Sequence, residues 1–385
     1  AIERSGLHRR LALSTLHTLG GSPRRLVWGF LVVTAALSMW LSNTATTLML
    51  LPIALAVSNR IEDAKTPVRM LLAVAFGASI GGMGTLVGTP PNLVLAGMAP
   101  NLVPNLPSIT FGGWMLFGLP IVAVMLPVAG LLLGRGLPRK RIPLEALDEE
   151  RRALGAWTTA EKRAAVLFAL TAVAWITRSG MTVGTFHVPG WSHLLTTPRL
   201  VSDAVPAIAA AILACLVPAG TGDKRPLVTW SEVRHGVPWG ILLLFGGGFA
   251  IADAFHASGL DTWMAGELQG LGSLPLPLVI LSVVLLTAFV TNLTSNTATA
   301  TLLMPVMAAL AEAIHEPPYV LMASAAVAAS LAFVLPVATP PNAIIMGSGK
   351  VKASDLFKEG IRLNLIAVVL ITILCLALGP LVLPV

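Results

Sequence analysis

Apolar residues fill most of the chain in long runs, and short polar segments separate these runs. Many runs approach the roughly 20 residues that an α-helix needs to cross the hydrocarbon core of a bilayer. The pattern predicts an all-α polytopic membrane protein. We expect its uninterrupted spans at 111–134, 164–178, 201–218, 237–257 and 363–383.

Two of the apolar runs bend around a polar tip that has the same sequence in both. The tip reads SNTAT at 42–46 and again at 295–299. The arm before the first tip, 26–41, has 16 residues, which is roughly 24 Å as a helix and less than the ~30 Å of the hydrocarbon core. We therefore expect two re-entrant helical hairpins, at 26–58 and 277–313, that enter the membrane without crossing it.

A second motif interrupts two other apolar runs. It reads GTPPN at 88–92 and ATPPN at 338–342. Proline has no backbone N–H, and it pushes the residue before it out of helical geometry. The two consecutive prolines therefore predict broken transmembrane helices at 68–98 and 319–346.

The two motifs recur in the same order and at nearly the same distance. The serine of SNT precedes the threonine of TPPN by 47 residues in the first copy and by 44 residues in the second. The chain is therefore predicted to contain two related halves. The expected domains are an interfacial amphipathic helix at 1–25, a first repeat at 26–134, a cytoplasmic loop with a short helix at 135–163, scaffold-type spans at 164–257 and a second repeat core at 258–385.

Composition and charge support the membrane assignment and orient the chain. Hydrophobic residues make up 55% of the sequence and charged residues 11%, whereas soluble domains hold about 25% charged residues. Of the 25 Lys and Arg residues, 23 lie in loops that the spans place on one side, and such loops are normally cytoplasmic. These loops are 1–25, 59–69, 135–163, 219–236 and 347–362. We expect a multi-pass protein of the plasma membrane (the inner membrane in a bacterium), and the net charge of +7 implies no nucleic-acid partner.

With this orientation, the first hairpin enters from the cytoplasmic side and the second from the outside. The halves are therefore predicted to be inverted repeats, an architecture of secondary transporters whose sites lie near the midplane at broken helices. Non-helical backbone at that depth is tolerated only where protein buries it or a wet cavity meets it. We therefore expect the four polar loops to form one site.

The four loops offer hydroxyl groups, side-chain amides and free carbonyls, and they contain no carboxylate, histidine or lysine. Neutral oxygen ligands suit a hard cation such as sodium. Hydroxyl, amide and helix N-terminal donors suit the carboxylates of an anion. Each ion would offset the charge of the other, which is a physical reason for coupling. The simpler alternative, in which these Ser and Thr residues only bond to nearby backbone, accounts poorly for the double recurrence.

Neither an enzyme nor a disulfide framework is expected. The segment GASIG at 77–81 matches a hydrolase pattern, but it lies in a helical run without the strand–turn–helix context and without a paired acid and histidine. Cys215 and Cys375 both lie in apolar runs. Asp253 is an acid within a span, but its place near the outer end favours an interfacial role over a proton relay.

The two SNT motifs, each followed by a T-P-P-N element, resemble the paired signature of the divalent anion:sodium symporter (DASS) family, which includes the INDY-type dicarboxylate transporters. The resemblance covers the whole chain. It implies an elevator-type homodimer in the lipid bilayer. It also implies uptake of a di- or tricarboxylate anion (succinate, malate, fumarate or citrate), with sodium as the coupling ion.

The resemblance also implies which residues form the site. A first sodium ion would be held by Ser38, Ser42, Asn43 and Gly88, and a second by Thr291, Thr294, Asn296 and Ala338. The substrate would be held by Ser42, Asn43, Thr44, Thr89, Ser295, Asn296, Thr297 and Thr339. Family members carry further spans before the surface helix. Because the sequence has no starting methionine, we expect the chain to begin partway through a longer protein.

Three other functions stay open at this point. A sodium-independent dicarboxylate exchanger should carry a fixed positive side chain near the site, and the four loops contain none. A sulfate:sodium symporter would use the same kind of site. An anion channel is the most remote alternative, because it predicts rings of charge or repeated filter carbonyls along a pore, and the sequence has neither.

Overall fold

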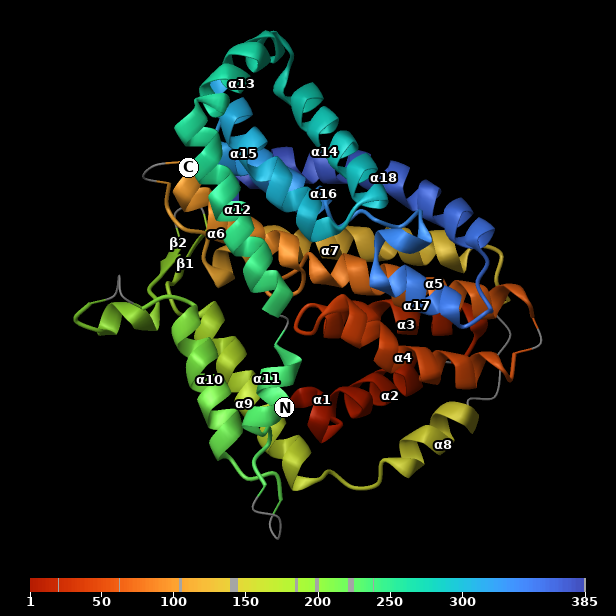
Figure 1. Ribbon diagram of the computed structural model, residues 1–385. Coiled ribbons are helices and arrows are strands. Elements are labelled where there is room, and N and C mark those ends of the chain that lie inside the picture. Colours follow the sequence, from red (N-terminus) through yellow and green to blue (C-terminus); the bar gives the residue numbers. More distant parts are fainter. Residues whose placement is uncertain are drawn as a thin grey trace.

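The computed structural model describes residues 1–19, 21–61, 63–103, 106–138, 145–183, 186–197, 201–220, 225–237 and 239–383. Within these residues the chain is almost entirely helical (Figure 1), so the predicted helical fold is confirmed. One small antiparallel ribbon, formed by β1 (Met181–Val183) and β2 (Phe186–Val188), departs from the all-α expectation. Strands of three residues are too short to produce a recognisable alternation in the sequence.

The N-terminal segment forms two helices rather than the single helix expected at 1–25. Between α1 (Ile2–Ser5) and α2 (Leu7–Leu19) lies Gly6, whose φ of 79° is in the left-handed region that favours glycine. Leu13 and Leu16 of α2 are buried, and α2 packs on the helix that follows it. The apolar face of α2 therefore contacts the protein itself.

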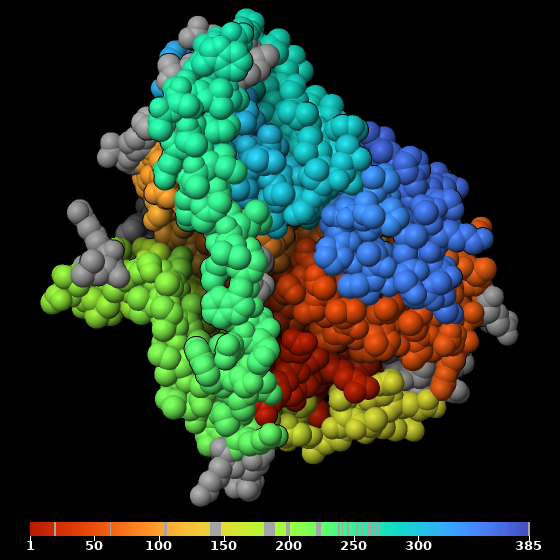
Figure 2. All heavy atoms as spheres, viewed as in Figure 1, coloured from red at the N-terminus to blue at the C-terminus, as the bar shows by residue number. Residues whose placement is uncertain are grey.

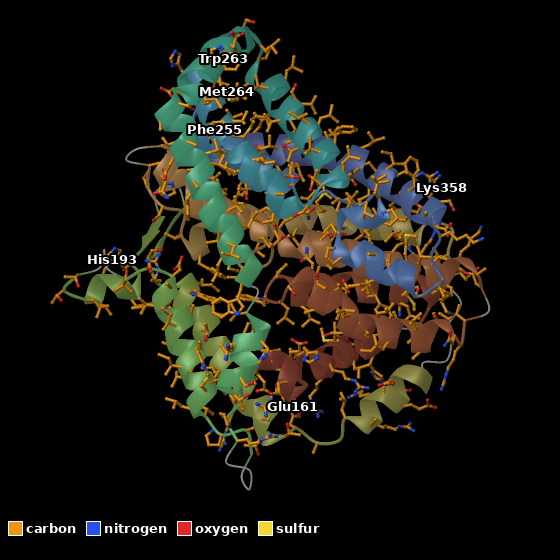
Figure 3. The ribbon with its side chains drawn as sticks, in the orientation of Figure 1. Glu161, His193, Phe255, Trp263, Met264 and Lys358 are labelled. Carbon is orange, nitrogen blue, oxygen red and sulfur yellow. The ribbon has the colours of Figure 1, made fainter. Side chains whose placement is uncertain are left out.

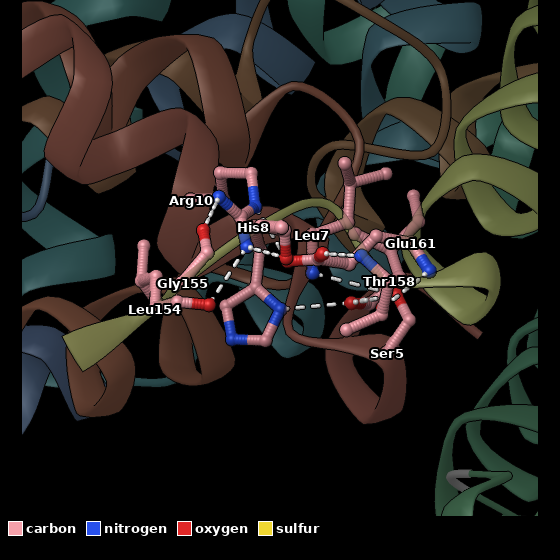
Figure 4. A network of polar contacts seen from close by, with 10 residues as sticks. Ser5, Leu7, His8, Arg10, Leu154, Gly155, Thr158 and Glu161 are labelled. Atoms are coloured by element: carbon pink, nitrogen blue, oxygen red, sulfur yellow. Dashed lines mark hydrogen bonds and ion pairs between the residues drawn. The ribbon is translucent and has the colours of Figure 1, made fainter. Parts of the chain in front are cut away.

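A buried ion pair fastens α2 to the middle of the chain (Figure 4). Arg10 Nε donates to Glu161 Oε1 across 2.7 Å. The same guanidinium donates to the carbonyl oxygens of Leu154, Gly155 and Ala156, each at 3.0 Å. Burial raises the pKa of Glu161, but the hydrogen bonds from Arg10 and Thr158 outweigh this effect and hold that pKa below its usual value. The carboxylate therefore stays ionised and paired.

The first half contains the predicted hairpin and broken helix. The hairpin consists of α3 (Pro23–Ser38) and α4 (Asn43–Ser58). Serine caps begin both arms, because Ser22 Oγ accepts from the Arg25 N–H and Ser42 Oγ accepts from the Ala45 N–H. The rest of this half comprises α5 (Lys65–Gly82), α6 (Pro90–Leu102) and α7 (Phe111–Gly134). The chain between α5 and α6 is the first break.

The second half has the same order of elements. It comprises α14 (Leu276–Leu293), α15 (Asn296–Ile314), α16 (Pro318–Ala328), a 3₁₀ turn (Pro336–Ala338), α17 (Pro340–Gly347) and α18 (Ala353–Val382). The chain between α16 and α17 is the second break. The helix α18 begins ten residues before the predicted span 363–383. Its first turns carry charged residues, so the apolar pattern alone placed them in a loop.

The segment between the halves contains further helices. They are α8 (Glu145–Ala153), α9 (Thr159–Ile176), α10 (Ala204–Leu216), α11 (Trp230–Gly236), α12 (Trp239–Ser258) and α13 (Leu260–Leu268). Two 3₁₀ turns, Trp191–Leu194 and Gln269–Ser273, lie among them. The helix α11 falls in 219–236, which was expected to be a loop. The helix α13 falls in 258–276, between the predicted span 237–257 and the predicted second hairpin. Figure 3 labels Phe255 on α12 and Trp263 and Met264 on α13, in the upper part of the view.

The short helix after each break packs against the opposite half. The helix α6 packs against α15 and α16, whereas α17 packs against α4 and α5. One hydrophobic core runs through both halves. By contrast, α9 and α10 bury few side chains, and α10 to α13 lie along one side of the molecule (green in Figure 2). The halves therefore form one densely packed unit with a thinner layer beside it.

Four of the described helices are long and apolar enough to cross a membrane, as judged by length and composition. They are α7, α14, α15 and α18. The arms of the second hairpin, with 18 and 19 residues, are longer than the two 16-residue arms of the first. By length, the arms of the first hairpin are therefore too short to cross the membrane, whereas those of the second are long enough to cross it.

Candidate functional site

The tip of the first hairpin places two neutral oxygen atoms side by side. Ser38 is buried at the end of α3, and its hydroxyl donates to Asn43 Oδ1 across 2.7 Å. Asn43 is the first residue of α4, directly after the capping Ser42. The Asn43 side chain also carries an NH₂ group, which is a separate donor.

The first break brings a third oxygen to the same place. A methyl group on Gly82 would lie 2.8 Å from Asn43 Oδ1 and 3.2 Å from the Gly88 carbonyl oxygen. Both oxygens therefore approach one glycine, and a side chain there would collide with them. Ser38, Asn43 and Gly88, with Ser42 beside them, are the residues predicted for the first sodium ion. Sodium binding there stays a prediction.

The tip of the second hairpin repeats this arrangement. Thr291 is buried at the end of α14, and its Oγ1 lies 2.8 Å from Asn296 Oδ1 and 2.6 Å from the Ala329 carbonyl oxygen. A hydroxyl has one proton and can serve one of these acceptors at a time. A cation among these oxygens would stabilise the cluster, so the donor set fits sodium.

Other residues predicted for the second tip lie close by. Thr294 Oγ1 and Thr299 Oγ1 are 2.7 Å apart, and Ser295 Oγ accepts from the Ala298 N–H to cap α15. Ala338 is buried in the 3₁₀ turn before α17. The two tips are thus built alike, from a hydroxyl residue and an asparagine five positions later.

Helix packing links the elements that carry the predicted substrate residues of the two halves. Thr89 and Thr339 are buried N-caps, of α6 and α17 respectively. Because α6 packs on α15 and α17 packs on α4, each threonine begins a helix that lies against the opposite hairpin. Thr297, in the first turn of α15, is half-buried. Contacts within each tip are direct, whereas the link between the tips runs through these two short helices.

A cavity of about 480 Å³ opens at the first tip. Ser42 and Thr44 form one wall, and Glu3 and His8 from the N-terminal helices form another. The sequence does not predict Glu3 and His8 at this tip, because the apolar pattern does not show where the N-terminal segment folds back.

Four further polar residues, which the sequence pattern does not predict, hold the breaks. Asn92 and Asn342 each donate two hydrogen bonds to backbone carbonyls of their break. Thr85 donates to the Met39 carbonyl at the first tip, and Asn292 bonds the second break to α14. One signal could have revealed the first pair, because asparagine recurs as the last residue of both T-P-P-N motifs.

Comparison with known proteins decides the family. Residues 1–326 match the family model described as citrate transporter, CitMHS. The chain belongs to this family. The Na(+)/dicarboxylate cotransporter 3 of Rattus norvegicus is 32% identical over 464 aligned residues, which cover 97% of this chain and 76% of that protein. The sodium-dependent dicarboxylate transporter SdcS of Staphylococcus aureus (strain MRSA252) is 36% identical over 404 residues, covering 100% of this chain and 74% of that protein. These relatives confirm the resemblance to the DASS family.

Two solved structures share the fold of this CitMHS-family chain. MtrF of Neisseria gonorrhoeae, described as one of a class of antimetabolite efflux pumps, matches with a TM-score of 0.66 at 14% identity, covering 97% of this chain and 77% of that one. The YdaH transporter of Alcanivorax borkumensis matches with a TM-score of 0.65 at 16% identity, covering 100% and 85%. Family and fold together identify a multi-pass membrane protein of a transporter family rather than an enzyme. The bacterial relatives indicate the plasma membrane.

Proposed function

We propose that this chain couples sodium influx to the uptake of a di- or tricarboxylate anion. The observation that carries the proposal is the matched pair of tips, in which Ser38 faces Asn43 and Thr291 faces Asn296. Each tip offers neutral oxygens to a cation and an amide NH₂ group to an anion. The relatives named as sodium-dependent dicarboxylate transporters support it.

Coupling follows from the absence of fixed charge in the four loops. A dicarboxylate brings two negative charges into a region of low effective dielectric, where an unpaired charge costs several kcal/mol. One sodium ion at each tip supplies two positive charges. Anion binding therefore depends on sodium, with one ion held by Ser38, Ser42, Asn43 and Gly88 and the other by Thr291, Thr294, Asn296 and Ala338.

Two tips also account for a substrate with two carboxylates. One carboxylate meets Ser42, Asn43 and Thr44, and the other meets Ser295, Asn296 and Thr297. Thr89 and Thr339 cap helices whose N-terminal N–H groups favour negative charge. We expect succinate, malate, fumarate or citrate to fit better than a compact dianion such as sulfate, because sulfate cannot present two separated carboxylates.

An elevator movement and a homodimer belong to the same proposal. The two halves share one hydrophobic core, whereas α9 and α10 bury little and expose large apolar side chains such as Leu170 and Ile208. A dense unit can move as a body beside a thinner, static layer, which the partner subunit and lipid would cover. This contrast in packing supports the elevator over a movement within the core.

Uptake into liposomes tests the proposal. Purified protein in liposomes should accumulate radiolabelled succinate above the outside concentration when sodium is high outside, and should not do so when choline replaces sodium. Equal accumulation in choline would instead indicate a sodium-independent exchanger. Equilibration without accumulation would indicate a channel.

Labelling from one side tests the proposed inverted repeats. In a variant lacking Cys215 and Cys375, Ser258→Cys should react with a membrane-impermeant thiol reagent from outside the cell. Ala153→Cys should react only after the membrane is permeabilised. Both positions are exposed, so access is set by the side of the membrane. The reverse pattern would contradict the inversion.

A further inference from the structure

The last residue of each T-P-P-N motif makes the same pair of hydrogen bonds. The amide of Asn92 donates to the carbonyl oxygens of Gly82 at 3.0 Å and Thr85 at 2.7 Å. The amide of Asn342 donates to those of Ala332 and Leu335, both at 2.9 Å. In both halves the acceptors lie ten and seven residues before the asparagine.

These carbonyls lie at or beyond the end of the preceding helix, where no intrahelical N–H is available to them. Carbonyls at the end of a helix have no intrahelical partner, and the prolines that follow have no N–H to offer. A primary amide carries two N–H donors, and each asparagine uses both on its break. Asn92 and Asn342 are fully buried, at 0% exposure, so water does not replace these bonds.

The Oδ1 atoms show which part of the asparagine is used. In both halves Oδ1 is buried and has no hydrogen-bond partner among the described residues. The two N–H donors are thus satisfied while the acceptor is left unpaired, at a cost of about 1–3 kcal/mol each. The donors are therefore what the position requires.

One acceptor connects each asparagine to a predicted sodium ligand. The Thr85 carbonyl that accepts from Asn92 also accepts from the Gly88 N–H at 3.3 Å. In the second half, the Leu335 carbonyl that accepts from Asn342 also accepts from the Ala338 N–H at 3.3 Å. The asparagine thus shares its acceptor with the N–H of residue 88 or 338, the residue whose carbonyl is predicted to bind sodium.

We propose that Asn92 and Asn342 are positioning residues for the two sodium sites, one for each half. Each holds its break in the shape that presents a backbone carbonyl to sodium, without touching sodium or substrate itself. The inference rests on the proposed sodium-coupled function. A merely structural role would lower the stability of the protein without changing its apparent affinity for sodium.

Sodium titrations of Asn92→Ala and Asn342→Ala test the proposal. The sodium concentrations that half-saturate succinate uptake and thermal stabilisation of the purified protein should each rise about tenfold, equivalent to about 1.4 kcal/mol. Uptake at saturating sodium should remain within about threefold of wild type, since the ligands themselves are retained. The double variant should need more sodium than either single variant, because each asparagine serves a different site.

A control variant and a milder variant complete the test. Asn101→Ala, on the exposed side of the same helix α6, should leave the sodium dependence unchanged. Asn92→Ser keeps one hydroxyl donor, placed one bond nearer the backbone than the amide nitrogen, and should show a shift no larger than that of Asn92→Ala. The positioning role would be overturned if the half-saturating sodium concentrations of the variants were unchanged and only their thermal stability or yield were lower. If no variant folds, the asparagines are structural and the proposal is equally overturned.

The two readouts separate this inference from the proposed function. The proposed function would be contradicted if sodium stabilised the wild-type protein but the protein accumulated no succinate. In that case the positioning role would still be supported if the variants needed more sodium than wild type for half-maximal thermal stabilisation. Wild-type protein that transports succinate, with variants of unchanged sodium dependence, would contradict the positioning role alone.

Discussion

The two breaks have the same shape but are held to their hairpins by different means. Residues 77–92 align without gaps with 327–342, and both segments end in TPPN. Where the first has Gly77, Gly81, Gly82, Gly84 and Gly88, the second has Val327, Leu331, Ala332, Val334 and Ala338. The asparagine bonds are conserved between the halves, whereas the packing beneath them is not.

The first break depends on backbone packing. A methyl group on Gly77 would lie 2.6 Å from the Leu31 carbonyl oxygen, and one on Gly81 would lie 2.2 Å from that of Ala35. Helices α3 and α5 therefore approach as closely as their backbones allow. One side-chain bond, from Thr85 Oγ1 to the Met39 carbonyl, joins this break to its hairpin tip.

The second break is bound by a side chain instead. Asn292 of α14 donates to the carbonyl oxygens of Ala288 at 2.7 Å and Leu331 at 3.0 Å, and its Oδ1 accepts from the Val334 N–H at 3.0 Å. Residues with side chains stand where the first break has glycines. The Asn292 amide bonds this break directly to α14. Close approach and amide bonding are thus alternative ways to hold one loop geometry.

The largest expected effect comes from blocking the backbone contact. Gly81→Ala places a Cβ against the Ala35 backbone, where nothing flexible can move aside. We expect a loss of about 3 kcal/mol or more and little folded protein, measured by size-exclusion chromatography and thermal unfolding. Gly97→Ala is the control, because its Cβ would meet Phe249 at an ordinary 3.8 Å. Normal folding of Gly81→Ala would contradict the role of close packing.

A smaller effect is expected where side chains hold the break. Asn292→Leu leaves the Leu331 carbonyl and the Val334 N–H buried without partners, at about 2–5 kcal/mol in total. Thr85→Val removes the bond to the Met39 carbonyl and the bond that Thr85 Oγ1 accepts from the Gly88 N–H at 3.1 Å. The Gly88 N–H still donates to the Thr85 carbonyl, so we expect a loss of about 1 kcal/mol. Thermal unfolding in detergent should show a larger loss of stability for Asn292→Leu than for Thr85→Val. Equal or reversed losses would mean that the second break does not depend on Asn292.

The smallest effect is expected from making the second half resemble the first. Ala338→Gly removes one methyl group and adds backbone freedom, at about 1 kcal/mol or less. Sodium-dependent uptake should persist, since the backbone carbonyl of residue 338 remains. Abolished uptake with a normal yield of folded protein would show that the two halves cannot exchange these residues.

The sequence predicted the parts of this fold that local chemistry determines. Helices begin and end at the predicted tips and breaks, because proline and the serine caps act on adjacent residues. The start of α18 was missed, because its first turns are charged rather than apolar. The bonds of Asn92 and Asn292 were missed for another reason: their partners are set by how the chain returns after a break.

The central claim is that the two tips form one sodium-dependent anion site. Asn43→Asp and Asn296→Asp test it most directly, because Asp keeps the size of Asn but loses the NH₂ donor and adds a negative charge that repels the dianion. Each variant should fail to accumulate succinate while sodium still stabilises the folded protein, and Asn101→Asp should transport normally. Succinate accumulation near the wild-type rate by either tip variant would contradict the account.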